Sequence, residues 1–227
     1  MFFKQIGAGG DRNFAYIVAD GESREAAVFD PGMEPGRILD IIGREGFTLK
    51  YIINTHDHFD HIGGNHDIKE ATGTEILCHP LEREAIEKLN EYSLYTMAQQ
   101  WGLEFKAVSI DGTVEDCDII QVGDVKLEVV HNPGHTPGCI SFMLEEDGVK
   151  SLICGDIAGA SGRLGYINGP GFVLDDWKKS IKKLVEISPQ RLYPGHGTFL
   201  LADAPSHLKL YDQKMNAAWT TIITEVG

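Results

Sequence analysis

Three histidines and an aspartate fall within six residues, as His56, His58, Asp60 and His61. In an extended segment, side chains two residues apart point the same way, so His56 and His58 can converge on one ion while Asp60 and His61 reach past it. A polar loop that is rich in histidine by chance is the alternative interpretation. The stretch lies between a short apolar run and two glycines, and this context favours a metal-binding motif whose spacing suits two neighbouring ions.

Three further candidate ligands lie far along the chain. His135 and His196 each occur in a turn rich in glycine and proline, directly after an apolar run that is typical of a strand. Asp156 ends another apolar run, which is a suitable place for a carboxylate that bridges two ions. Each of these residues alone is typical of an ordinary turn. Together they indicate ligands at strand ends, presented by loops on one edge of a sheet.

These motifs resemble those of the metallo-β-lactamase-fold hydrolases, and more narrowly the glyoxalase II-like members. The matching segments follow the order of that family and span residues 13 to 197: Asn13-Phe14, Asp30-Pro31-Gly32, the histidine-rich motif, Gly134-His135-Thr136-Pro137-Gly138, Gly155-Asp156 and Tyr193-Pro194-Gly195-His196-Gly197. The resemblance implies two divalent metal ions. It assigns the first to His56, His58 and His135, the second to Asp60, His61 and His196, and a bridging position to Asp156. Zn²⁺ is the expected metal, and imidazole and carboxylate ligands also suit Fe²⁺ or Mn²⁺.

Composition and charge narrow the class of protein. A chain of 227 residues with 42% hydrophobic content can bury a substantial core, and residues 1–227 are expected to form a single domain. The N-terminus lacks a signal-like apolar segment and no run approaches the ~18 apolar residues of a membrane span, so we expect a cytoplasmic protein without membrane contact. A net charge of −14 argues against nucleic acid as a partner and leaves a small-molecule substrate.

The apolar pattern predicts strands and helices in alternation. Strands are expected at 13–19, 25–30, 50–54, 74–78, 119–121, 124–131, 138–145, 149–154 and 191–193, and helices at 35–45 and 175–187. Asp175 is the expected N-cap of the second helix, with Trp177, Ile181, Leu184 and Val185 as its buried stripe. This order fits an α/β fold with helices outside two packed sheets. The family resemblance specifies the topology, a four-layer αβ/βα sandwich of the metallo-β-lactamase type.

The expected chemistry is hydrolysis. Two closely held divalent ions supply a bridging hydroxide at neutral pH, and this nucleophile would attack an activated carbonyl, with Asp60 orienting it. A thiolate can leave without protonation, which favours a thioester, and a lactone is the nearest variant. The alternative is a mononuclear non-haem iron enzyme resembling the persulfide dioxygenases, with Fe²⁺ held by His56, His135 and Asp156 alone. A metal-binding protein without catalysis is a third interpretation.

Three segments have an open role at this level. Residues 91–106, rich in aromatic side chains, could form a packing helix or an apolar wall over the metals. Residues 159–171, with Arg163 and Tyr166, could be a surface loop or a substrate loop. A packed helix is predicted at residues 208–223, and it could also bury a homodimer contact. Its apolar residues at near-helical spacing are Leu210, Tyr211, Met215, Trp219 and Ile222. Full-length glyoxalase II enzymes carry C-terminal basic residues that bind glutathione. In this sequence, Lys209 and Lys214 are the only Lys or Arg residues after Gly197.

Overall fold

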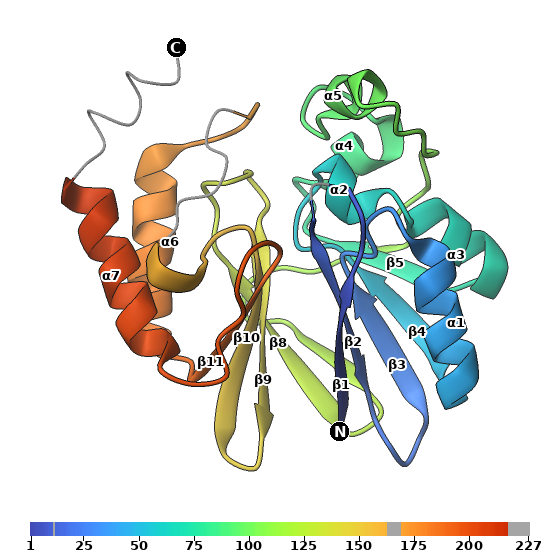
Figure 1. Cartoon of the computed structure of the whole chain (residues 1–227), viewed down its shortest axis with the longest axis horizontal. Helices are drawn as coiled ribbons and strands as arrows, with labels where there is room; N and C mark the ends of the chain where they lie inside the picture. The colour runs from blue at the N-terminus through green and yellow to red at the C-terminus, as the bar shows by residue number, and fades with distance from the viewer. Residues whose placement is uncertain (11, 163–168, 218–227) are drawn as a thin grey trace.

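The computed structural model of the chain describes residues 1–10, 12–162 and 169–217, and two β-sheets form its centre (Figure 1). The first sheet has the order β1-β2-β3-β4-β5-β6. Neighbours are antiparallel from β1 to β3 and parallel from β3 to β6. Its strands are β1 (Phe2–Gly7), β2 (Phe14–Ala19), β3 (Glu25–Phe29), β4 (Thr48–Ile53), β5 (Glu75–Cys78) and β6 (Gly112–Thr113).

The second sheet has the order β11-β10-β9-β8-β7. Strands β7 to β10 are antiparallel to their neighbours, and β11 adds to the edge parallel to β10. The strands are β7 (Ile119–Val122), β8 (Val125–His131), β9 (Ile140–Glu146), β10 (Val149–Gly155) and β11 (Arg191–Pro194).

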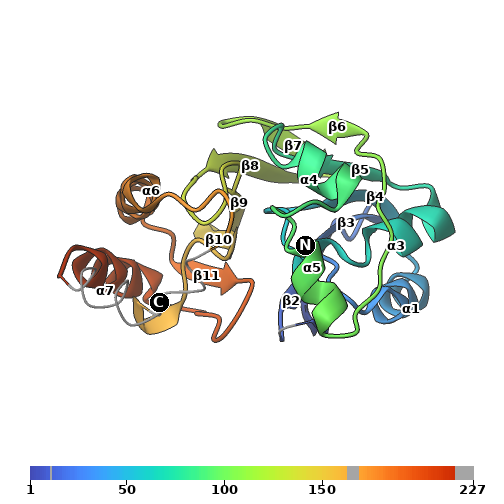
Figure 2. The same cartoon turned by 90° about the horizontal axis from the view of Figure 1, so that it is seen from above.

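Helices cover the outer face of each sheet, so that the fold has four layers (Figures 1 and 2). Helices α1 and α3 lie outside the first sheet, and α6 and α7 lie outside the second. The helices are α1 (Pro35–Glu45), α2 (Phe59–Ile62), α3 (Asn65–Thr72), α4 (Arg83–Lys88), α5 (Tyr95–Gln100), the 3₁₀ turn η1 (Ala160–Gly162), α6 (Leu174–Ile187) and α7 (Ala204–Ala217). The predicted four-layer sandwich is confirmed.

The layers follow from the alternation of side chains along the strands. In β2, Ile17 faces the helix-covered core while Tyr16 and Val18 face the other sheet. In β10, Leu152 packs toward the outer helices and Ile153 toward the first sheet. Both faces of these strands are apolar because both are buried.

Aromatic contacts fill the space between the two sheets. The rings of Phe29 and Phe142 lie 5.0 Å apart, edge to face, across this layer. The hydroxyl of Tyr16 donates a hydrogen bond of 2.6 Å to the carbonyl of Pro194. The two sheets are therefore held in one relative position near the edge where their strands end.

The predicted strands and the helices predicted at 35–45 and 175–187 agree with the structure to within about two residues, whereas the helix predicted at 208–223 begins four residues earlier, at Ala204. Three details also differ from the prediction. Helix α6 begins after Val173, and Asp175 lies in its first turn and does not cap it. Val185 is only half-buried, although it packs against the same core as the rest of the stripe. In α7, Tyr211 and Met215 are buried but Leu210 is exposed, and the predicted members Trp219 and Ile222 lie outside the described residues.

Strands β1 and β6 and the short helices α2, α3 and α4 had no counterpart in the sequence prediction, whereas α5 lies within residues 91–106, where a packing helix was one of the two interpretations. None of the helices in the described part of the chain combines the length and the apolar composition that crossing a membrane requires.

Candidate metal centre

The histidine-rich loop follows β4 and is fixed in place by Asp30, which follows the neighbouring strand β3. The backbone N–H of Thr55 donates to Asp30 Oδ1 at 2.8 Å, and its hydroxyl donates to Oδ2 at 2.6 Å. Asp30 is 2% exposed, so its charge is satisfied by these donors rather than by water. The loop then turns into the short helix α2, which carries Asp60 and His61 toward the same point.

One group of candidate ligands contains three buried imidazoles, those of His56, His58 and His135. His58 Nδ1 and His135 Nε2 face each other at 3.1 Å, and the ring of His56 lies 4.7 Å and 4.9 Å from the other two rings. Burial lowers the pKa of His56 and His135, and lowers that of His58 to about 3. These rings are therefore neutral at pH 7 and present lone pairs, as metal ligands must.

The second group combines Asp60, His61 and His196. His196 Nε2 lies 3.1 Å from Asp60 Oδ2 and 3.3 Å from His61 Nε2. Although burial opposes the shift, nearby carboxylates raise the pKa of both imidazoles, chiefly that of Asp60 for His61 and that of Asp156 for His196. Positive charge is therefore stabilised between these side chains, which is the electrostatic property of a cation site.

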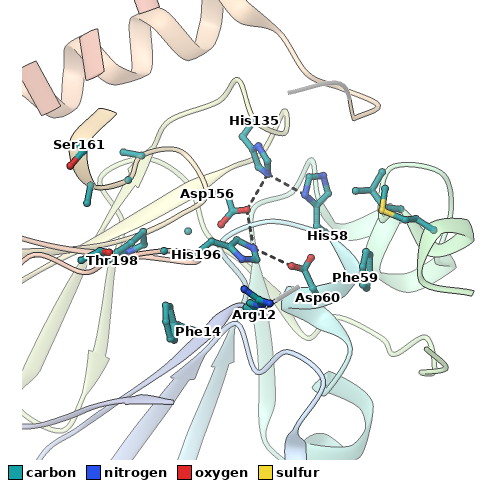
Figure 3. Close-up of a pocket in the computed structure, with 18 of the residues that line it drawn as sticks. Arg12, Phe14, His58, Phe59, Asp60, His135, Asp156, Ser161, His196 and Thr198 are labelled. Atoms are coloured by element: carbon teal, nitrogen blue, oxygen red, sulfur yellow. Dashed lines mark hydrogen bonds and ion pairs between the residues drawn. The ribbon is translucent and has the colours of Figure 1, made fainter. Parts of the chain in front are cut away.

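Asp156 lies between the two groups, at the end of β10 (Figure 3). Its Oδ2 is 3.7 Å from His135 Nε2 in the first group and 3.4 Å from His196 Nε2 in the second, and its Oδ1 is 3.6 Å from His61 Nε2. One carboxylate thus reaches both groups, as a bridging ligand requires. The backbone approaches so closely that a Cβ on Gly195 would lie 2.3 Å from Asp156 Oδ1.

Several buried atoms around these points lack a hydrogen-bond partner among the described residues. They include His56 Nε2 and Asp156 Oδ1, and each lies within a set of metal-ligating residue types. Buried polar atoms without partners cost free energy unless something binds them. The donor set therefore fits two cations that prefer nitrogen and oxygen ligands.

A second layer of hydrogen bonds orients the candidate ligands. Asp30 Oδ2 accepts a bond of 3.0 Å from His61 Nδ1, and Thr55 Oγ1 lies 3.0 Å from His56 Nδ1. Because the Thr55 hydroxyl proton already points to Asp30, His56 Nδ1–H is the donor in its pair. Both rings therefore turn their Nε2 lone pairs toward the metal positions, and Asp30 orients a ligand in each group.

A buried glutamate joins two of the ligand-bearing loops. Glu82, at the start of α4, is fully buried. It accepts one backbone hydrogen bond from Asp57 at 2.9 Å and another from Gly138 at 2.5 Å. Burial raises the pKa of Glu82 to about 7, and burial together with the Glu82 carboxylate raises that of Asp57. Glu82 therefore connects the loop of His56 and His58 to the loop of His135.

A pocket opens over both groups (Figure 3). His58, Asp60, His135, Asp156 and His196 line it together with two kinds of neighbour. Apolar side chains come from residues near α2 and α5, namely Phe59, Leu94, Met97 and Trp101. The remaining lining residues are Arg12, Phe14, Gly155, residues 158–161, Pro194, Gly197 and Thr198. The 91–106 segment thus provides an apolar wall, whereas Arg163 and Tyr166 of the predicted substrate loop lie outside the described residues.

All seven predicted ligands meet in this centre. Three residues that orient them were not predicted in that role. Asp30 belongs to a motif of the family resemblance and is the last residue of a predicted strand, which is a usable signal. Thr55 precedes the first histidine, and Glu82 has no distinguishing sequence context.

Comparison with known proteins tests the family. A family model of the metallo-beta-lactamase superfamily matches residues 8–196. The chain belongs to this superfamily. The glyoxalase II resemblance is confirmed as well, because several relatives at about 30% identity are hydroxyacylglutathione hydrolases.

Two relatives of this superfamily member carry different activities in their names. A hydroxyacylglutathione hydrolase of Rhodospirillum rubrum is 31% identical over 186 residues, which cover 81% of this chain and 62% of that protein. A mitochondrial persulfide dioxygenase of Bos taurus is 34% identical over 134 residues, covering 59% of this chain and 44% of that protein. The chain therefore spans less than two thirds of the length of either relative.

A solved structure supports a centre with two metal positions. A crystal structure of a protein in a di-iron-bound form is 28% identical to this chain and superposes with a TM-score of 0.74. The match covers 91% of this chain and 96% of that one. The His and Asp groups in this fold thus indicate a dinuclear centre, and the comparison leaves zinc and iron as candidate metals.

Proposed function

We propose that this protein is a dinuclear metal-dependent hydrolase that cleaves an activated carbonyl, a thioester or a lactone, in a small-molecule substrate. His56, His58 and His135 would hold one ion, and Asp60, His61 and His196 the other, with Asp156 as a ligand to both. The observation that carries the proposal is the convergence of two complete ligand groups on one carboxylate beneath an open pocket. Two bound divalent ions supply a hydroxide at neutral pH and polarise a substrate carbonyl.

The side chains of the pocket favour a leaving group that needs no proton. Apart from the ligand candidates, none of the described residues that line the pocket is a His, Cys, Asp or Glu. A dedicated general acid for an alkoxide or amine is therefore lacking in this part of the structure. A thiolate leaves as an anion, so the lining supports a thioester over a lactone. We assign to Asp60 the role of orienting the attacking oxygen, because it lines the pocket and its Oδ2 lies 3.1 Å from His196 Nε2 and 3.7 Å from His61 Nε2 of the same group.

A mononuclear iron dioxygenase is the second candidate, and the persulfide dioxygenase relative is the observation that favours it. That enzyme would need only His56, His135 and Asp156 for its iron. The hydrolase is the better account because Asp60, His61 and His196 form a second group of metal-ligating residues. A single iron held by His56, His135 and Asp156 would leave this second group without a metal.

Metal analysis combined with a substrate panel tests the proposal. Purified protein is expected to contain about two ions per chain and to hydrolyse thioesters faster than lactones. Asp60→Ala and His196→Ala should lose turnover and retain about one ion. His66→Ala, which removes a partly exposed histidine on the outer helix α3, is the matched control and should keep both properties. One iron per chain with persulfide-dependent oxygen uptake would replace the hydrolase with the dioxygenase.

A further inference from the structure

The loop between β1 and β2 places a single arginine at the edge of the pocket (Figure 3). This loop is fixed to the metal centre by backbone contacts. Ala8 N–H donates to the Asn13 carbonyl at 2.9 Å, and the Asn13 side-chain amide donates to the backbone carbonyl of Asp60. A Cβ on Gly10 would lie 2.6 Å from Asp60 Cβ, so the loop packs directly against this candidate ligand. The backbone on either side of Arg12 is therefore held in contact with Asp60, a candidate metal ligand.

The charge of Arg12 has no partner in the described part of the chain. It is the only Lys or Arg among the described residues that line the pocket, and no carboxylate among the described residues pairs with it. Arg12 is exposed, and in a protein with a net charge of −14 it places a cation with no partner among the described residues at the pocket that contains the candidate ligands. The two nearby carboxylates, Asp60 and Asp156, already face histidines of the metal groups.

A guanidinium in this position suits a planar anion. Arginine presents paired N–H donors that match the two oxygens of a carboxylate, and the pair becomes stronger when a substrate displaces water from the pocket. Leu94, Met97 and Trp101 line another part of the same pocket with apolar surface. The pocket thus offers one cationic point and one apolar wall, and both line it together with the metal groups.

We propose that Arg12 determines substrate specificity by binding a carboxylate of the substrate, which makes the substrate class an anionic thioester. This inference rests on the proposed hydrolase function and adds the charge that the substrate must carry. The carboxylate could belong to the leaving thiol or to the acyl group, and the position of Arg12 serves either. Arg12 is a binding residue and takes no part in proton transfer.

The test uses matched substrates that differ only in charge. One pair is an acyl thioester of 3-mercaptopropionate and of 3-mercaptopropionamide, and a second pair carries the acid or amide on the acyl group. Metal-loaded wild type should prefer the acid in at least one pair. Arg12→Gln should raise KM for that acid about tenfold, with kcat within about twofold, and leave the amide within about twofold. Arg12→Lys should lie between the two.

Arg44→Gln is the matched control, because it removes one positive charge from the outer helix α1 and keeps the net charge equal to that of Arg12→Gln. It should leave the acid preference intact. Equal effects of Arg12→Gln on acid and amide, or no effect on either, would overturn the proposal.

A binding measurement separates this proposal from the hydrolase itself. Calorimetric titration of the metal-loaded protein with the non-hydrolysable thioether analogues of the same acids and amides needs no turnover. If no thioester or lactone is hydrolysed, the proposed function fails, while tighter binding of an acid analogue by wild type and its loss in Arg12→Gln still support the role of Arg12. Equal affinity for acid and amide analogues in wild type would refute that role whether or not hydrolysis occurs.

Discussion

Replacing Asp30 with asparagine should weaken both halves of the metal centre, although Asp30 is not itself placed as a ligand in either half. Its carboxylate accepts three hydrogen bonds, two from Thr55 and one from His61 Nδ1. An asparagine keeps one accepting oxygen and replaces the other with an NH₂ group. If that NH₂ faces His61, Nδ1 of the imidazole must accept a hydrogen bond from it. The ring proton then lies on Nε2, the atom whose lone pair is required to bind the metal.

The size of the effect follows from the number of ligands that Asp30 orients. Loss of an outer hydrogen bond to a ligating histidine typically costs 10–100-fold in metal affinity, or about 1.4–2.7 kcal/mol. The ion at His61 should lose affinity in this range because its ligand contacts Asp30 directly. The ion at His56 should lose less, because Thr55 lies between. The metal-free protein should also lose about 1.5–3 kcal/mol of stability, the value of one hydrogen bond to a buried charge.

Chelator competition gives the two stepwise affinities, and circular dichroism confirms that the variant is folded. Asp118→Asn is the matched control, since Asp118 accepts a backbone hydrogen bond in an exposed turn and lies outside the pocket. It should bind both ions with wild-type affinity. A folded Asp30→Asn protein that did the same would refute the reasoning, because the orientation of His61 would then not depend on this carboxylate.

Three further predictions concern other parts of the fold. Glu82→Gln should weaken the ion at the three-histidine group about tenfold in the same competition assay, because it loses one of two loop-joining acceptors, while Glu84→Gln on the exposed side of α4 should change nothing. Gly195→Ala should abolish binding of at least one ion, measured by metal content, since its Cβ would overlap the bridging carboxylate; Gly36→Ala in α1, where a Cβ meets nothing within 4 Å, should keep both ions. Burial and the stacked imidazole of His131 lower the pKa of His79 to about 4. Between about pH 4 and 6.5 the unfolded chain therefore binds more protons than the folded chain, and the folded state loses stability as the pH falls through this window. Urea unfolding of the metal-free protein should show a smaller fall for His79→Gln than for wild type, and equal slopes would contradict the assignment.

The sequence was sufficient to select the seven candidate ligands that the structure brings together, and most of the strands. Ligand types and their spacing carry chemical information directly, so His56 to His61 could be interpreted without a fold. Strand β8 alternates buried Leu127 and Val129 with exposed Lys126 and Glu128, and β10 is buried on both faces from Ser151 onward, so the apolar pattern identifies each strand to within a residue or two. The capping residue of a single helix is harder to predict, because backbone geometry can start a helix without a capping side chain. Helix α6 is an example, since Val173 precedes it and makes no side-chain capping hydrogen bond.

The orienting residues could not be predicted in the same way. Glu82 lies in a stretch rich in charged residues, and nothing in that composition distinguishes a buried carboxylate from a solvated one. Its role depends on Asp57 and Gly138, which lie 25 and 56 residues away, and on a backbone N–H of each. Backbone donors have no sequence signature, so such a contact becomes visible only when the fold places the loops together.

The relative position of the two sheets determines whether the candidate ligands can meet. Each metal group takes ligands from loops of both sheets: His135 joins residues that follow β4, and His196 joins Asp60 and His61 across 135 residues of sequence. Hydrogen bonds between the sheets hold this edge together, from the Ile140 N–H to the Thr55 carbonyl at 2.9 Å and from the Phe14 N–H to the Gly195 carbonyl at 2.8 Å. A sliding of one sheet over the other would therefore separate both groups at once. The apolar layer between the sheets thus sets the geometry of the metal centre, although it supplies none of the seven candidate ligands.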